Sequence, residues 1–118
     1  MIKVFFELNL GSRLKEHALL LEANINRYRS HIGAYKGVES PSYSVVVPKL
    51  NASLIELFRA CKQESVLVVD NNNKAKLIYL KDLREEHIGT YKKVTKKEAL
   101  KSDAYTMDLL NFNYYMVK

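Results

Sequence analysis

Five lysines lie within ten positions near the end of the chain, and they form the densest group of candidate anion-binding residues. They are Lys92, Lys93, Lys96, Lys97 and Lys101, with Glu98 as the only acidic residue among them. The pattern T-K-K-E from Thr95 to Glu98 fits a capping box, which predicts that a helix begins there. The helix macrodipole disfavours cations in a first turn, whereas the free backbone N–H groups attract anions. The stretch therefore predicts a surface for a phosphate or an acidic protein, with a solvated helix face as the alternative.

A second basic cluster lies between residues 26 and 37 and contains no acidic residue. Its cations are Arg27, Arg29 and Lys36, and they are interleaved with Tyr28, His31 and Tyr35. Arginine and aromatic side chains together suit stacking on unpaired bases. Tyr28 also falls on an apolar helical stripe, so packing in the core is the alternative interpretation for it.

Residues suited to metal binding are scattered along the chain. His17, His31 and His87 lie far apart, and the single cysteine has no partner, so no zinc-ligand spacing exists. Glu85 and Glu86 precede His87, but adjacent side chains point in different directions on a strand or a helix. The sequence predicts no metal site.

Two further residues stand where enzymes sometimes place catalytic groups. Asp70 follows an apolar strand but runs into three asparagines, which indicates a turn. Cys61 shares a helical face with Phe58 and Leu54, which favours a buried, unreactive thiol.

Motifs that bind nucleotide phosphates are absent. The chain has four glycines and neither the pattern G-x-x-x-x-G-K-[ST] nor G-x-G-x-x-G. Residues Ser12 to Lys15 match S-x-x-K, but its companion motifs are missing. We therefore expect no cofactor, and an enzyme whose site comes from distant residues is only a secondary alternative.

The elements that would position these residues follow from hydrophobic periodicity. Residues 2–8 predict a strand, and residues 12–33 predict a helix that begins at Ser12 and ends at Gly33 as its C′ residue. The helical stripe consists of Leu14, Ala18, Leu21, Ile25, Tyr28 and Ile32. A strand is the alternative for part of this segment, because apolar residues also alternate from Leu19 to Ile25.

The remaining elements alternate less regularly. Strands are predicted at 42–48, 65–70, 74–80, 88–94 and 113–118, and helices at 52–63 and 95–109, the first capped by Asn51. The last helix would bury Leu100, Ala104, Met107 and Leu110. This order, β-α-β-α-β-β-β-α-β, predicts a single α+β domain over residues 1–118, with two to three helices on a mixed sheet of about five to six strands. Its first β-α-β unit would form a parallel crossover.

The composition limits the classes of protein that fit. The chain has 118 residues, of which 47% are hydrophobic and 27% charged, as expected of one globular domain. The net charge of +6 favours anionic partners. One cysteine, no signal sequence and no membrane-spanning run predict a cytoplasmic protein. The 14 lysines against 5 arginines and the nine asparagines are typical of AT-rich genomes, including those of bacteriophages.

These observations favour a small non-enzymatic regulatory protein. It would act as an inhibitor or adaptor by docking on a larger protein or nucleoprotein through a basic face made from the two clusters. The first alternative is direct nucleic-acid binding through residues 92–101. The second is a small enzyme with a site that local motifs do not reveal.

Overall fold

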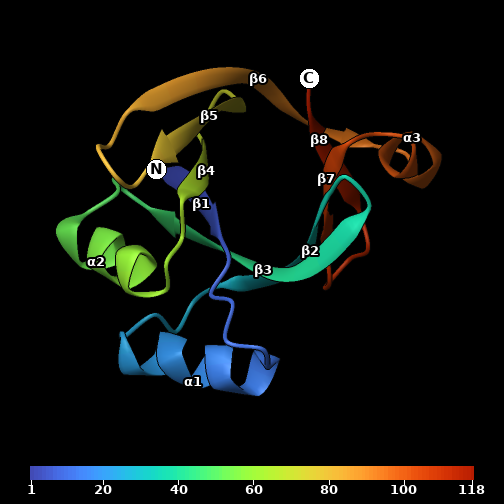
Figure 1. Cartoon of the computed structure of the whole chain (residues 1–118). Coiled ribbons are helices and arrows are strands. Elements are labelled where there is room, and N and C mark those ends of the chain that lie inside the picture. The colour runs from blue at the N-terminus through green and yellow to red at the C-terminus, as the bar shows by residue number, and fades with distance from the viewer.

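The computed structural model describes residues 1–118 and forms a closed barrel of eight strands (Figure 1). The strands are β1 (Ile2–Phe6), β2 (Arg29–Tyr35), β3 (Val38–Val47), β4 (Ser65–Val69), β5 (Lys74–Tyr79), β6 (Glu85–Val94), β7 (Ala104–Asp108) and β8 (Tyr114–Val117). The helices are α1 (Arg13–Glu22), α2 (Ala52–Ala60) and α3 (Lys96–Leu100). Around the barrel the strands follow the order β1-β3-β2-β7-β8-β6-β5-β4, and every neighbouring pair is antiparallel. None of the helices is long and apolar enough to cross a membrane.

The predicted mixed sheet with helices packed on it is therefore wrong, and so is the parallel crossover. Residues 29–33 and 104–108, both assigned to helices from the sequence, belong to the strands β2 and β7, which pair with each other. With these two strands added, the sheet has enough strands to close on itself and leave no open edge.

The first predicted helix is correct only in its first half. Ser12 caps α1 as expected, since its hydroxyl accepts from the Lys15 N–H at 3.5 Å. The helix ends at Glu22, and the chain reverses through Asn24 with φ of 60°, so Gly33 lies inside β2 and is not a helix cap.

The apolar stripe predicted for this helix is also wrong. Leu14 and Leu21 are 80% and 61% exposed, whereas Glu16 and Leu20 face the barrel. A buried carboxylate is tolerated there because Glu16 accepts a hydrogen bond of 2.7 Å from the Tyr43 hydroxyl. Hydrophobic periodicity alone therefore predicts the wrong buried face for α1, because the apolar Leu14 and Leu21 face the solvent.

The last predicted helix is shorter than expected. Thr95 caps α3 as predicted, with its hydroxyl accepting from the Glu98 N–H at 3.1 Å, but the helix ends at Leu100. Leu100 and Leu110, assigned to its buried stripe, are both exposed. Pairing of β7 with β2 overrides the local helical pattern, as tertiary contacts often do.

Several local predictions are confirmed. The strands near 2–8, 42–48, 65–70, 74–80, 88–94 and 113–118 all exist, and Asn51 caps α2 by accepting from the Leu54 N–H at 2.9 Å. The turn between β4 and β5 depends on Asp70, whose carboxylate accepts from the backbone N–H groups of Asn72 and Lys74. Asn73 adopts the left-handed conformation that this turn requires, with φ of 60°.

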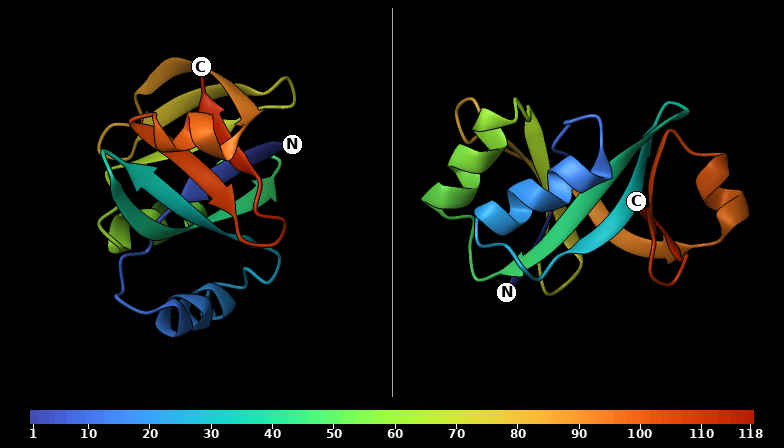
Figure 2. Two further views of the ribbon diagram at one scale, coloured as in Figure 1. Left: turned by 90° about the vertical axis from the view of Figure 1, so that its right-hand side faces the viewer. Right: turned by 90° about the horizontal axis from the view of Figure 1, so that it is seen from below.

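The main hydrophobic core lies outside the barrel wall. Helices α1 and α2 cover the outer face of the sheet around β1, β3 and β4, and α3 lies near β7 and β8 (Figures 1 and 2). The core consists of Val4, Phe6, Leu8, Leu20, Tyr43, Val45, Leu54, Phe58, Val66, Val68, Ile78 and Leu80. This layer leaves the inner face of the barrel free to carry polar residues.

The inner face is apolar on one side and polar on the other. Phe5 packs there with Val69 and Ala75, and this small cluster is separate from the main core. Across the barrel, the inward face of β2 and its neighbours carries polar side chains, because His31 pairs in register with Ser42 on β3 and Asp108 on β7. Gly89 permits closure of the barrel. Its neighbour Thr90 pairs with Lys118, and a side chain at position 89 would collide with the Lys118 backbone.

Candidate functional site

A cavity of about 1120 Å³ occupies the barrel, and all eight strands contribute to its lining. Sites for small molecules usually measure roughly 300–1,000 Å³, so this cavity has room for a nucleoside-sized ligand. Its two main walls come from strands on opposite sides of the barrel. We call them the serine–glutamate wall, formed by Glu7, Ser40 and Ser42, and the tyrosine wall, formed by Tyr91 and Tyr115.

The serine–glutamate wall lies at the end of β1 and on the adjacent β3. Side chains alternate along β3, so Ser40 and Ser42 face the interior while Tyr43 packs in the outer core. The Ser40 hydroxyl donates to the Glu7 carboxylate at 2.7 Å, and the Ser42 hydroxyl has no partner. A carboxylate and a free hydroxyl thus face the cavity side by side.

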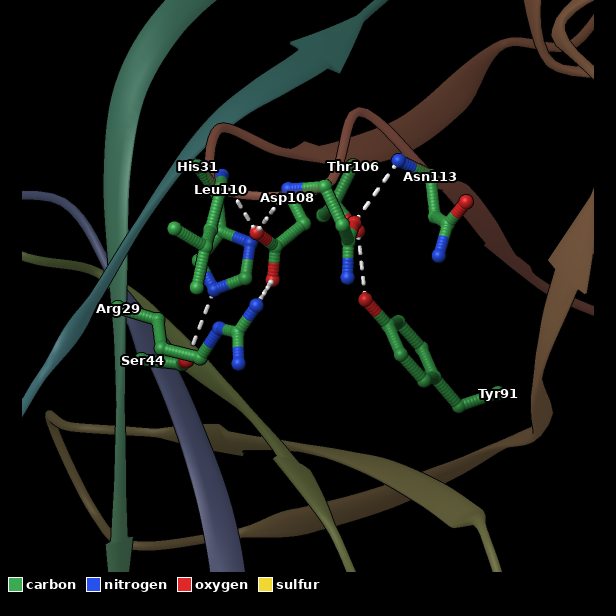
Figure 3. A network of polar contacts seen from close by, with 9 residues as sticks. Arg29, His31, Ser44, Tyr91, Thr106, Asp108, Leu110 and Asn113 are labelled. Atoms are coloured by element: carbon green, nitrogen blue, oxygen red, sulfur yellow. Dashed lines mark hydrogen bonds and ion pairs between the residues drawn. The ribbon is translucent and has the colours of Figure 1, made fainter.

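The tyrosine wall is uncharged, and Phe5 packs against it with its ring centroid 5.2 Å from that of Tyr91. The rings of Tyr91 and Tyr115 stack with centroids 5.2 Å apart and an interplanar angle of 7°. The Tyr91 hydroxyl is 2.6 Å from the Thr106 hydroxyl, which fixes the ring against β7 (Figure 3). Burial raises the pKa of Tyr91, so this residue stays a neutral phenol at physiological pH.

The hairpin between β2 and β3 forms the mouth of the cavity. Tyr35 and Val38 line it and are 63% and 71% exposed. Lys36 lies over the Tyr35 ring, at 5.4 Å from its centroid. Burial and the neighbouring Glu39 carboxylate raise the pKa of Tyr105, which lines the cavity on the adjacent strand. The mouth therefore combines aromatic surface with charges of both signs.

A polar network borders the cavity on β2, β3 and β7 (Figure 3). Arg29 forms an ion pair of 2.8 Å with Asp108, whose other oxygen accepts from the Leu110 N–H at 2.8 Å. His31 Nε2 lies 2.8 Å from the Ser44 hydroxyl, and its Nδ1 has no partner. These contacts hold the polar side chains of β2, β3 and β7 in place.

The electrostatics of this network are set by burial and by one ion pair. Burial lowers the pKa of His31 to about 4, because a charged imidazole would lose its hydration, so the ring is neutral at pH 7. Burial alone would raise the pKa of Asp108, but hydrogen bonds from Arg29 and Leu110 outweigh it and lower this pKa. Asp108 is therefore ionised beside a neutral histidine.

The five lysines of the 92–101 cluster are all exposed, and none forms an ion pair. Glu98, the acidic residue among them, pairs with Lys118. Because α3 has only five residues, the macrodipole invoked from the sequence is small. Binding of an anionic partner by this cluster stays a prediction.

The second basic cluster is divided by the fold. Arg27 precedes β2, Arg29 is bound to Asp108, and Lys36 lies at the tip of the β2–β3 hairpin. The Lys36 N–H donates to the Asp103 carbonyl at 2.6 Å, which places the hairpin tip just after α3. The backbone thus brings one residue of this cluster near the end of the other cluster, and partner binding here also stays a prediction.

The other sequence candidates lie away from the cavity. Cys61 caps α2, and burial raises the pKa of its thiol, which disfavours the reactive thiolate. Asp70 and His87 line a separate hollow of about 280 Å³, where Asp70 serves the β4–β5 turn. No three histidine, cysteine, aspartate or glutamate side chains converge closely enough to hold a metal ion.

Neither wall of the cavity is predicted from the sequence. One signal was available: Ser40, Ser42 and Ser44 alternate with apolar residues along β3, the pattern of a strand with one polar face. The remaining lining residues come from the other seven strands and their connections, and only closure of the barrel brings them together.

Inside the small closed barrel, a carboxylate, a free hydroxyl and stacked tyrosines line a cavity with room for a small molecule. Residues 9–118 match the model of the S-adenosylmethionine lyase family, and the chain belongs to this family. No curated protein matches the chain.

Membership in this family overturns the leading functional prediction. A chain that matches a lyase family over residues 9–118 points to an enzyme and not to a non-enzymatic inhibitor or adaptor. The alternative of a small enzyme with a site assembled from distant residues agrees better with the match. No short segment contains the cavity lining, so local motifs do not reveal the site.

Proposed function

We propose that this protein cleaves a carbon–sulfur bond of S-adenosylmethionine in the barrel cavity. The observation that carries the proposal is the match to the S-adenosylmethionine lyase family over residues 9–118. The cavity supports it, because its size and its mixture of aromatic and charged groups suit a nucleoside joined to an amino acid.

The chemistry follows from the sulfonium centre of the substrate. When the bond from sulfur to the aminobutyryl chain breaks, both bonding electrons pass to sulfur, which becomes the neutral thioether of methylthioadenosine. The carbon fragment is completed either by attack of the substrate's own carboxylate or by loss of a proton from the neighbouring carbon. Neither route consumes water, which distinguishes a lyase from a hydrolase.

The cavity offers a complementary group for each part of this substrate. Aromatic faces attract a cation such as sulfonium, and Tyr35, Tyr91, Tyr105 and Tyr115 all line the cavity. Glu7 and Glu64 supply negative charge, while Lys36 and Lys62 supply positive charge for a carboxylate. We also place this activity in the cytoplasm, which the free thiol of Cys61 supports.

The direct test is to incubate the purified protein with S-adenosylmethionine and separate the products by chromatography with mass detection. We expect methylthioadenosine to accumulate in step with loss of substrate. In water labelled with heavy oxygen, a hydrolase would place solvent oxygen on the carbon that leaves sulfur, whereas a lyase would not. Intact substrate after long incubation would contradict the proposal.

Gly33 provides a matched pair of variants that tests whether the cavity is the site. A Cβ at this position would lie 3.4 Å from the Ser42 hydroxyl, an ordinary contact, so Gly33→Ala should keep activity. The larger side chain of Gly33→Leu would project into the cavity beside Ser42 and Glu7 and should strongly reduce cleavage while the protein stays folded. Full activity in Gly33→Leu would place the reaction elsewhere.

A further inference from the structure

The lysine cluster of residues 92–101 has no part in the proposed reaction. Its five lysines are exposed and form no ion pair, and none of them lines the cavity. The neighbouring Glu98 is already paired with Lys118, so it does not neutralise the cluster. Like charges held on one surface repel each other, and an anionic partner would remove that repulsion.

The fold determines which of these lysines share a face. Lys92 and Lys93 are neighbours on β6, so their side chains point to opposite faces of the sheet. Tyr91 lines the cavity, which places Lys93 on the inner side and Lys92 on the outer side. Helix α3 also stands outside the barrel, beside β7 and β8 (Figure 1). The lysines available on the outside are therefore Lys92, Lys96, Lys97 and Lys101.

The β2–β3 hairpin adds an aromatic ring and a fifth cation at the end of α3. The Lys36 N–H donates to the Asp103 carbonyl at 2.6 Å, and Tyr35 pairs in register with the next residue of β7. The hairpin tip therefore lies directly beyond α3 (Figure 2). The Tyr35 ring is exposed, and the Lys36 ammonium group lies 5.4 Å from its centroid. Exposed aromatic rings among cations suit unpaired bases, which stack while their phosphates meet the charges.

This surface stays positive when its acidic neighbours are counted. Asp103 follows α3, and Glu39 lies on β3 beside the hairpin. The four outer lysines and Lys36, set against these two carboxylates, leave a net charge of +3. A membrane fits this surface less well, because α3 has five residues and a single exposed apolar side chain, Leu100.

We propose that this surface binds single-stranded nucleic acid, with the lysines on phosphate groups and a base stacked on Tyr35. We call it the α3 face, and it consists of Tyr35, Lys36, Lys92, Lys96, Lys97 and Lys101. It lies outside the barrel and is a second binding function, independent of the proposed cleavage of S-adenosylmethionine.

The experiment measures, by fluorescence anisotropy at several salt concentrations, the affinity for a labelled oligothymidylate of about 20 nucleotides, longer than usual single-strand sites. Each phosphate contact on a single strand contributes about −0.7 to the slope of log affinity against log salt, so five lysines predict a slope of roughly −3.5. The double variant Lys96→Glu and Lys97→Glu should weaken binding by at least about tenfold at low salt and reduce the slope to roughly −2. Tyr35→Ser should weaken binding by about fivefold to a hundredfold and leave the slope unchanged.

The double variant Lys15→Glu and Lys81→Glu is the matched control. It makes the same change in net charge, with exposed lysines on α1 and in the β5–β6 turn, away from α3 (Figure 1). Because charges at that distance are screened by salt, binding should weaken by less than about threefold. Equal weakening in the two double variants would show attraction to the overall charge alone and would overturn the proposal.

A labelled duplex of the same length and vesicles of phosphatidylglycerol separate the other anionic partners. The duplex should bind more weakly than the single strand, because its paired bases are not free to stack on Tyr35. The vesicles should not bind. Tighter binding of the duplex, binding of the vesicles alone, or no binding of the single strand at low salt would each contradict the proposal. Binding is measured without turnover, so these results do not depend on whether the protein cleaves S-adenosylmethionine.

Discussion

The two faces of strands β1 and β3 have opposite characters. On the outer face, Phe6 and Tyr43 are buried under the helices in the main core. One residue away on the inner face, Glu7 and Ser42 line the cavity. A single step along each strand therefore separates residues that hold the fold together from residues available to a ligand.

This contrast shows how a barrel of this size tolerates a polar interior. Most of the buried apolar contacts lie between the sheet and α1 and α2, and only a small cluster around Phe5 lies inside, so the rest of the barrel interior does not have to be filled. Substitutions in the outer layer should change stability and leave the chemistry per folded molecule intact. Substitutions in the inner layer should change the chemistry and leave stability intact. The exception is the buried polar network of Arg29, His31 and Asp108.

The largest effect on stability should come from Phe58→Ala. Phe58 is fully buried on α2 and packs against Phe6, with ring centroids 4.8 Å apart. Removing the ring should cost about 3–5 kcal/mol of unfolding free energy, measured by urea denaturation. The smaller change Phe58→Leu should cost less, and cleavage per folded molecule should stay the same in both. A selective loss of activity at full stability would show that the outer layer also contributes to the chemistry.

Acidification should destabilise the protein through His31. Its pKa is about 4 in the fold, against about 6.5 in the unfolded chain, so the unfolded state binds a proton more readily. The neutral ring therefore supports the fold fully above pH 6.5, and about 3 kcal/mol should be lost as pH falls from 6.5 to 4. Urea denaturation across this range measures the loss.

His31→Gln is the control for that titration, because glutamine is polar but does not take up a proton. Its unfolding free energy should change much less between pH 6.5 and 4, although the variant is less stable at pH 7. Asp108, whose pKa is lowered, should act only at still lower pH. An unchanged pH dependence in the variant would exclude His31 as the cause.

A smaller loss should follow from Tyr43→Phe. The Tyr43 hydroxyl donates to Glu16, which is buried and keeps only the Leu10 N–H as a donor when that hydroxyl is removed. We expect a loss of about 1–3 kcal/mol in thermal or urea unfolding. Tyr28→Phe is the matched control, because Tyr28 packs against Tyr43 but its hydroxyl forms no hydrogen bond, and it should change stability by less than about 0.5 kcal/mol.

The smallest effect should come from the lysine cluster. The double variant Lys96→Glu and Lys97→Glu alters two exposed side chains without ion pairs, so stability should change by no more than about 0.5 kcal/mol. Cleavage of S-adenosylmethionine should also be unchanged, because neither residue lines the cavity. A large loss of activity would show that the site extends to α3.

The parts of the fold that local chemistry determines could be predicted from the sequence. Caps at Ser12, Asn51 and Thr95 need only neighbouring backbone groups, and the asparagine-rich turn needs only a left-handed residue at Asn73. The nature of β2 and β7 could not be predicted, because each is stabilised by a partner far away in the chain.

The candidate site was hidden for the same reason. Glu7 and Tyr115 come from opposite ends of the sequence and share a cavity only in the closed barrel. The buried face of α1 could not be predicted for a different reason, since Glu16 faces inward and Leu14 outward. The Tyr43 hydroxyl and the Leu10 N–H make that arrangement favourable by donating to Glu16, and no helical periodicity contains them.

The pairing of β2 with β7 also has a kinetic consequence. Strands β4, β5 and β6 are consecutive and can assemble early, whereas β2 must wait for a segment translated much later. Such long-range pairing slows folding, because the chain loses loop entropy before the contacts form. A ligand held inside the sheet can bind only after this last step. It should therefore delay unfolding and leave the folding rate unaffected.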